Sequence, residues 1–592
     1  MKLPGLTELA TSRDIVDVFG GYNHNLRIGG GEFYDMKNLT SSYHPVLSPR
    51  SKRGTYVKGI NPQGMIAKDS LCYVDGTEFV MNEHRIDMGL STKEEDCPKT
   101  LVSMGAYVII LPDKKYINTL DLADNGNIEA SFTTTADVSF SLCKLDGGEY
   151  ANVKMGATEP EAPSNMELWL DTSSTPHALK QYSKTSEMWV QIPTTYIKIS
   201  SPGIGAAFKQ YDGVTISGIK RENLNDLNAN MVLWDVYHNE EDNGAGDYIV
   251  VIGILDEVVT QTLEEGAITI ERKMPIMDFV IESENRLWGC HYGVANNGEV
   301  VNEIYCCKLG DFKNWNCFMG LSTDSYVASV GSDGVFTGAI THLGYPLFFK
   351  ETCLHKVFGN YPANYQIQTT ACRGVQKGSE KSLAIVNEVL FYKGRNGVCA
   401  YDGSLPAEMS TVLGEVSYSD AVAAGYSYKY YISMKDASGE YSLFVYDSMK
   451  GMWHKEDNLA VKEFCACRNE LYFIPKNGTE IKTINGSGEV DADPIKWMAE
   501  TGVIGTSMPD KKYVSRLNVR MALDIGTRVY FYIQYDSNGA WEHLNTMTGT
   551  SLRSFSFPIK PKRCDHFRLR IEGEGNAKVY SITKTLEEGS DI

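Results

Sequence analysis

Cysteines and histidines are the first side chains in this sequence whose spacing could support chemistry. Cys306 and Cys307 are adjacent, and one residue separates Cys465 from Cys467. A zinc knuckle needs at least two residues between its cysteines and a second pair of ligands, so neither spacing is typical of a zinc site. The 11 histidines contain no His-Glu-x-x-His motif. We therefore expect these cysteines, and also His291 and His355, to be packing or surface residues rather than metal ligands.

Three other stretches could bind a cation or a phosphate group. Residues 239–247, NEEDNGAGD, offer the oxygen ligands that calcium prefers, but they lack the EF-hand order and its closing glutamate. Gly203 and Gly205 are followed by Phe208 where a dinucleotide-binding motif requires a third glycine. The run 29–31, GGG, lacks the lysine of a P-loop. We expect a solvated hairpin tip at 239–247, and we predict no metal ion and no cofactor.

A glycosidase would need two carboxylates that face each other across the substrate. The 75 acidic residues show no motif that singles out such a pair. Residues 536–539, DSNG, together with Trp541, resemble the Asp-box of sialidases, but they occur once and outside the repeat described below. The sequence therefore predicts no catalytic residues and a protein that is not an enzyme, with a propeller glycosidase as one alternative.

Composition indicates a large folded protein of the β class. The 592 residues are 42% hydrophobic and 22% charged, which predicts two to four folded domains. Tyrosine occurs 34 times against 8 tryptophans, and tyrosine fits pleated, half-buried surfaces. The 54 glycines suggest many tight turns.

Charge and targeting signals limit the partners. The net charge of −19 argues against a protein that wraps nucleic acid, although an acidic wall would let DNA slide past without sticking. The 13 cysteines are scattered, as in a product of a reducing cytoplasm. Met1 to Pro4 lead into no apolar segment, and the run 106–111 is too short to span a membrane. We expect neither a signal peptide nor a membrane partner.

A short repeat organises the chain. Leu383 to Gly403 contains three apolar runs separated by polar or glycine-bearing turns, which indicates an antiparallel meander. Related second strands at Leu287, Leu347, Leu390, Tyr430 and Leu471 recur at intervals of 60, 43, 40 and 41 residues. A period near forty with three or four strands is typical of a β-propeller.

We therefore predict an all-β protein: a β-propeller of about six to seven blades, with an inserted β domain and a C-terminal β-sandwich. Six blades would result if the first unit paired with the last to close the ring. The expected domains follow in chain order: 1–53 an extended arm over the body or a neighbour, 54–120 the first blades, 121–270 a platform-like β-rich insertion, 271–490 the remaining blades, 491–592 the sandwich.

The arm carries a resemblance to a known family. Its pattern of FGG.N, then EF..M.NL, then P.LSPR..RG resembles the N-terminus of tail nozzle, tail tubular B or stabilisation proteins of tailed phages. The matching residues are Phe19, Gly20, Gly21, Asn23, Glu32, Phe33, Asn38, Leu39, Leu47, Arg50, Arg53 and Gly54. The match covers about forty residues.

The resemblance implies a structural virion protein made in the host cytoplasm and located in the phage tail. It implies a homo-oligomeric ring, commonly a hexamer, through which viral DNA is ejected without sticking. The implied partners are the portal or adaptor, other tail proteins and tail fibres. The alternative from the class of binding modules is a tail-tip or receptor-binding propeller that contacts host cell-surface carbohydrate.

Overall fold

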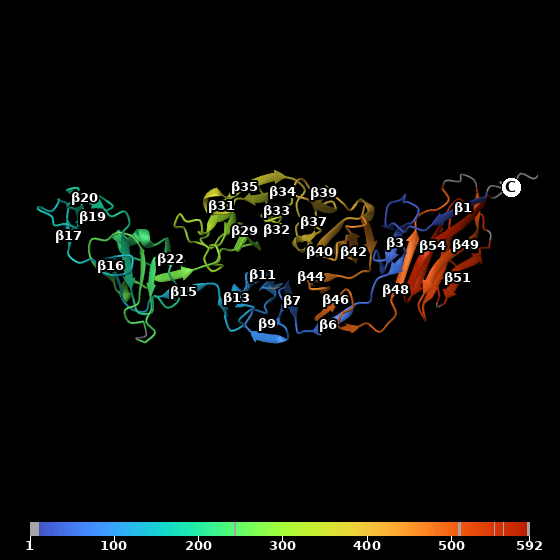
Figure 1. Cartoon of the computed structure of the whole chain (residues 1–592), viewed down its shortest axis with the longest axis horizontal. Coiled ribbons are helices and arrows are strands. Elements are labelled where there is room, and N and C mark those ends of the chain that lie inside the picture. Colours follow the sequence, from blue (N-terminus) through green and yellow to red (C-terminus); the bar gives the residue numbers. More distant parts are fainter. Residues whose placement is uncertain are drawn as a thin grey trace, which may run out of the picture.

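The computed structural model describes residues 11–96, 98–241, 244–506, 511–549, 551–560 and 562–588. The molecule is elongated, with the insertion at one end, the propeller in the middle and the sandwich at the other end (Figure 1). The predicted all-β fold class, with its propeller, inserted β domain and C-terminal sandwich, is confirmed. No helix in the described ranges has the length and apolar character needed to cross a membrane.

Seven sheets of the described chain form the propeller. The first two contain β7 (Pro62–Ala67), β8 (Leu71–Asp75), β9 (Glu78–Met81), β10 (His84–Asp87), then β11 (Thr100–Met104), β12 (Tyr107–Leu111), β13 (Lys115–Asn118), β14 (Asn125–Asn127). The third and fourth contain β28 (Phe279–Ser283), β29 (Arg286–Val294), β30 (Val300–Cys306), β31 (Tyr326–Ser329), then β32 (Gly338–His342), β33 (Tyr345–Lys350), β34 (Cys353–Phe358), β35 (Gln366–Ala371).

The remaining sheets complete the ring. The fifth and sixth contain β36 (Ala384–Val386), β37 (Val389–Lys393), β38 (Val398–Tyr401), β39 (Ala407–Glu408), then β40 (Tyr418–Tyr426), β41 (Lys429–Asp436), β42 (Tyr441–Asp447), β43 (Met452–Lys455). The seventh contains β44 (Val461–Cys467), β45 (Glu470–Pro475), β46 (Glu480–Thr483), β6 (Gly54–Lys58), β47 (Glu489–Val490). Short 3-10 helices lie in the connections: η1 (Glu94–Asp96), η4 (Pro362–Asn364), η5 (Glu380–Ser382), η6 (Thr411–Leu413).

The ring closes by combining strands from distant parts of the chain. β6, which directly follows the arm, pairs antiparallel with β46, and β44 packs against β7 of the first sheet. The repeat predicted the second strand of five blades, and each of these strands lies where expected, in β29, β33, β37, β41 and β45. This closing sheet, built from strands of both ends of the propeller sequence, holds the start of the propeller to its end.

Two-residue turns join the first and second strands in six of the seven blades. Asn387 and Glu388 have φ of 51° and 67°, and Ser427 and Tyr428 have φ of 48° and 63°. Two consecutive positive φ values are typical of the type I′ turn, whose twist matches that of a hairpin. Side chains near the turns between first and second strands donate hydrogen bonds to backbone carbonyls in the corresponding turn of the next blade. Examples are Lys68 Nζ to Gly105 O (2.6 Å) and Tyr426 Oη to Asn469 O (2.6 Å).

The insertion lies between β14 and β28 and has its own core. Its strands are β15 (Ala130–Thr133), β16 (Val138–Cys143), β17 (Val153–Gly156), β18 (Leu168–Asp171), β19 (Ala178–Ser183), β20 (Met188–Gln191), β21 (Tyr196–Ser200), β22 (Gly213–Ser217), β23 (Asn230–Val232), β24 (Asp235–Tyr237), β25 (Tyr248–Ile252), β26 (Val259–Gln261), β27 (Thr269–Arg272), with η2 (Glu222–Leu227) and η3 (Leu263–Glu265). β17 to β20 form a separate small sheet. Its tryptophans, Trp169 and Trp189, meet edge to face.

The sandwich includes strands from both ends of the chain. Its sheets have the orders β1-β54-β49-β52 and β2-β3-β48-β53-β50-β51. The arm supplies β1 (Thr11–Val16), β2 (Gly21–Tyr22), β3 (Glu32–Lys37), and also the small pair β4 (Leu39–Thr40) and β5 (Ser48–Pro49). The C-terminal part supplies β48 (Lys496–Thr501), β49 (Lys512–Leu523), β50 (Arg528–Tyr535), β51 (Glu542–Thr548), β52 (Arg553–Pro558), β53 (Phe567–Glu574), β54 (Ala577–Glu588).

The arm is therefore not only an extended segment over the body. β1 pairs with β54 and β3 pairs with β48, so the arm covers one edge of each sandwich sheet. Uncovered edges would expose rows of unpaired backbone groups. The sequence could not show this, because the arm strands and their partners lie more than 400 residues apart.

Candidate functional site

The arm junction is where the first residues of the chain meet the propeller and the sandwich. Phe19, Phe33 and Leu39 of the arm are buried, with at most 4% of each residue exposed. They belong to one hydrophobic cluster that also includes Trp453 of blade six and Trp497 of the sandwich. One continuous core thus joins the two bodies through the arm.

Asn38 is the polar centre of this junction. Its φ of 55° places it in the left-handed region, which asparagine tolerates better than most residues. Its backbone amide donates to the Glu456 carbonyl, and its side-chain Nδ2 donates to the Lys496 carbonyl at 2.7 Å. Its Oδ1 accepts from Arg50 Nε at 2.9 Å. Asn38 therefore links the arm to blade six and to the sandwich at once.

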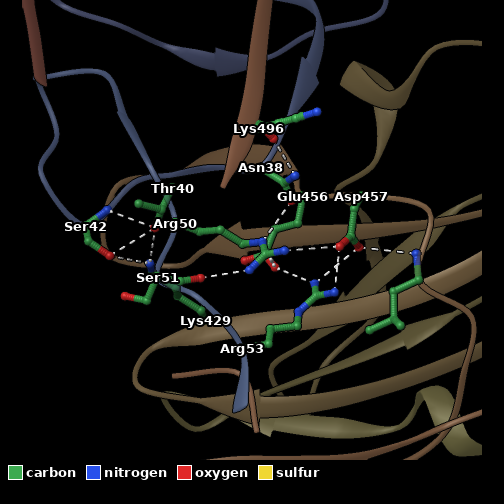
Figure 2. Close-up of polar contacts among 11 residues, drawn as sticks. Asn38, Thr40, Ser42, Arg50, Ser51, Arg53, Lys429, Glu456, Asp457 and Lys496 are labelled. Carbon is green, nitrogen blue, oxygen red and sulfur yellow. Dashed lines mark hydrogen bonds and ion pairs between the residues drawn. The ribbon is translucent and has the colours of Figure 1, made fainter. Parts of the chain in front are cut away.

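Two arginines of the arm face two acidic residues of the propeller (Figure 2). Arg53 donates to Asp457 Oδ2 at 2.6 Å and to Glu456 Oε2 at 3.0 Å. Arg50 reaches the same Asp457 oxygen at 3.3 Å. The side chains of Arg53 and Glu456 are only 9% and 5% exposed. Four charges thus balance in a largely buried cluster.

The electrostatics of this cluster favour the charged forms of its central pair. Burial by itself would lower the pKa of Arg53, but Asp457 and Glu456 raise it above its ordinary value. Burial would likewise raise the pKa of Asp457, and Arg53 and Arg50 hold it below its ordinary value. The arm is therefore held by ion pairs in which each buried charge stabilises the charged form of its partner.

A second polar group lies beside the cluster (Figure 2). The Lys429 ammonium donates to Ser42 Oγ at 3.1 Å and to Thr40 Oγ1 at 3.3 Å. Burial lowers the pKa of Lys429, while Asp447 and Glu456 act in the opposite direction. These groups line a pocket of about 430 Å³, which we call the arm pocket. Its other lining residues include Tyr43, Arg50 and Tyr428.

His454 lies near this pocket, and its buried imidazole should make the stability of the folded chain sensitive to acid. Burial lowers its pKa to about 3, with Lys429 adding to the effect, and Nδ1 has no hydrogen bond to the described chain. An unfolded histidine titrates near 6.5, so below that pH the unfolded state binds a proton that the folded state does not. Stability should fall by about 2 kcal/mol between pH 7 and pH 5 from this residue.

The measurement is denaturant unfolding of the full chain across that pH range. His454→Gln should flatten the loss of stability by about 2 kcal/mol relative to the parent chain. His84→Gln, at an exposed position, is the control. An unchanged pH dependence in His454→Gln would contradict the assignment.

The cysteines and histidines considered as metal ligands are packing residues in the structure. Cys306, Cys307, Cys465 and Cys467 are buried free thiols, and burial raises the pKa of each. Within the described ranges, no three His, Cys, Asp or Glu side chains are grouped so that they could hold a metal ion.

Histidines and acidic residues on the propeller strands have specific partners. His355 is fully buried between Ser332 (2.8 Å) and Thr369 (2.9 Å), and burial lowers its pKa to about 4. His291 lies 2.9 Å from Asp278. Glu463, on the innermost strand β44, accepts from the backbone amides of residues 64 and 65 at 3.0 and 2.7 Å.

The hairpin at 239–247 has an ordered base. Asp247 is fully buried and accepts from Asn239 N at 2.9 Å, and its other oxygen lies 2.6 Å from His238 Nδ1. Residues 242 and 243 lie outside the described residues. At the other end of the molecule, Asp536 and Ser537 have φ of 51° and 49° and form the turn between β50 and β51.

Sequence reasoning missed the residues that the arm contacts. Lys429, Glu456 and Asp457 lie in or between propeller strands, about 400 positions after the arm in the sequence. The available signal was the pair of consecutive acidic residues just after β43, since two carboxylates that become buried need cationic partners.

No family model matches the chain. Glucosamine-6-phosphate deaminase of Staphylococcus aureus is 25% identical over 151 residues, which are 24% of this chain. The matched part spans 58% of that relative's length, which is less than two thirds.

The similar solved structures have low TM-scores. An exo-β-1,3-galactanase of Phanerochaete chrysosporium is 8% identical with a TM-score of 0.20, covering 52% of this chain and 94% of that one. PorZ of the Porphyromonas gingivalis type-IX secretion system is 11% identical with a TM-score of 0.24, covering 88% and 82%. Trypanosoma rangeli sialidase is 9% identical with a TM-score of 0.18, covering 90% and 96%.

These comparisons correct one prediction. The sequence predicted a protein that is not an enzyme, and this is contradicted because the matches include glycoside hydrolases, a sialidase and a deaminase. The prediction relied on the lack of a recognisable motif, and carboxylates on separate blades need not form a motif.

Proposed function

We propose that the chain is a structural subunit of a phage tail, of the nozzle or tail tubular B class, that assembles with copies of itself into a ring. One observation carries this proposal: the arm residues of the resemblance are the residues that fasten the propeller to the sandwich. Asn38 bridges the two bodies, Arg50 and Arg53 form the buried ion pairs, and Phe33 and Leu39 enter the shared core. Such fastening suits a subunit that must stay rigid while DNA passes under force.

Charge and shape support the same proposal. Six copies with a charge of −19 each would carry −114, which suits a conduit that DNA passes without binding. The elongated body separates the insertion from the sandwich, so the two ends can contact different neighbours (Figure 1). We propose the portal or adaptor and the tail fibres as those neighbours.

Electron microscopy of the purified chain tests the proposal. We expect closed rings with a central opening, and the protein as a component of purified tails. A chain that stays monomeric and is absent from tails would refute the proposal. Deleting residues 1–53 should abolish ring formation and expose the sandwich edges that β1 and β3 now cover.

The propeller glycosidase is the second candidate, because glycoside hydrolases and a sialidase are among the solved structures to which the chain is similar. Hydrolysis assays of the full chain with aryl glycosides and host glycans decide it. Turnover that is lost on replacement of propeller carboxylates would favour this candidate. The lack of any turnover, together with ring formation, would reject it.

A further inference from the structure

The arm pocket holds an ammonium group without a carboxylate partner. Lys429 Nζ contacts two hydroxyl groups, Ser42 Oγ and Thr40 Oγ1, and no carboxylate of the described chain lies within 4.0 Å of it. Lys429 is half-buried, so water screens its charge less than that of a surface lysine. An incoming anion would therefore gain a charge-assisted hydrogen bond there.

The carboxylates that line the pocket are already engaged. Asp447 Oδ2 accepts from Ser41 Oγ at 2.5 Å, and its Oδ1 accepts from Met449 N at 3.1 Å. Glu456 accepts from Arg53 at 3.0 Å, inside the ion cluster. Neither acid forms an ion pair with Lys429, and the lining holds three cations, Arg50, Lys429 and Lys450, against these two carboxylates. The pocket therefore keeps a local positive charge although the whole chain is acidic.

Aromatic rings and small polar groups complete the lining. Tyr428 is 60% exposed and Tyr43 is 52% exposed, and both line the pocket. Lys578 packs on the Tyr43 ring with its ammonium 4.2 Å from the ring centroid, which restrains that ring. Asn485 and Ser427 add hydrogen-bonding groups. A volume of about 430 Å³ is suitable for one sugar ring with a substituent.

We propose that the arm pocket binds a carboxylated sugar, whose carboxylate is received by Lys429 and whose ring is flanked by Tyr43 and Tyr428. Tyrosine offers an apolar face and a polar hydroxyl, which suits the mixed surface of a saccharide. A phosphate or a simple carboxylate would use the ammonium but not the rings. The proposal does not depend on ring assembly, since every group belongs to one chain.

Binding of small probes to the full chain tests the proposal. By isothermal titration at pH 7 and low salt, glucuronate should bind at least about tenfold more tightly than glucose and than acetate. Equal affinity for glucose and glucuronate would overturn the role of Lys429. Equal affinity for acetate and glucuronate would overturn the sugar assignment, and no binding of glucuronate would overturn the whole proposal.

Two variants separate the groups involved. Lys429→Met should reduce the affinity for glucuronate at least about tenfold, to the level of glucose. Because Lys429 also contacts the arm, Tyr428→Ala provides a test at an exposed position and should weaken both sugars. Tyr361→Ala, 41% exposed and outside the pocket, is the matched control. If Tyr428→Ala and Tyr361→Ala bind glucuronate equally well, the proposal fails, whatever imaging shows about rings.

Discussion

Replacing Arg53 with methionine should destabilise the chain by roughly 3–5 kcal/mol, because it leaves buried carboxylates without their partner. Arg53 makes the shortest contact to Asp457 in this cluster, 2.6 Å, and also holds Glu456 at 3.0 Å. Methionine keeps an unbranched side chain of similar length, but it also loses the cation–π contact of the guanidinium with the Phe473 ring, 5.6 Å from the ring centroid. The loss should therefore report the charges rather than the volume.

The measurement is unfolding of the full chain by guanidinium chloride, followed by tryptophan fluorescence. Trp453 and Trp497 report on it because they lie in the core that the arm completes. Lys58→Met is the control, because Lys58 pairs with Glu480 at 3.6 Å with its side chain 71% exposed, and exposed pairs contribute about 0–1 kcal/mol. The double change Arg53→Met with Asp457→Leu leaves Arg50 and Glu456 balanced and should recover part of the loss. If Arg53→Met is no more destabilising than Lys58→Met, the ion cluster does not hold the arm.

Much of the fold could be predicted from local sequence. In the blade at 383–403 the predicted strand segments correspond to β36, β37 and β38, because short apolar runs and turn residues determine a meander locally. The insertion was visible because the period of about forty residues is interrupted between the second and third sheets. The two-residue turns, such as Asn387 with Glu388, followed from polar pairs between apolar runs.

The candidate site could not be predicted in this way. Arg53 and Asp457 are 404 residues apart in the sequence, and Ser42 and Lys429 are 387 apart. Nothing local to either partner specifies the other, since a polar residue at the end of a strand usually faces solvent. The closing sheet is similar, because β6 (Gly54–Lys58) pairs with β46 (Glu480–Thr483) from the other end of the propeller sequence. The arrangement of the whole chain determines contacts of this kind. The arm motif alone indicated that the arm has a role, but not which residues it contacts.

Replacing Gly21 with alanine should destabilise the arm junction by roughly 2–4 kcal/mol, through backbone strain and a backbone clash. Gly21 has φ of 88°, where residues with a side chain are strained. A Cβ at this position would lie 2.5 Å from the carbonyl oxygen of Trp453, which belongs to blade six. Because backbone cannot rotate away as a side chain can, β2 would have to move off the propeller.

Thermal unfolding and limited proteolysis measure this effect. Gly21→Ala should lower the melting temperature. It should also make the arm accessible to protease near Phe19, which is only 4% exposed in the parent chain. Gly30→Ala is the matched control in the same arm, because a Cβ there would have no heavy atom within 4 Å and its φ is not positive. We expect Gly30→Ala to behave like the parent chain. Equal melting temperatures for the two variants would mean that the close approach of Gly21 to blade six does not fasten the arm.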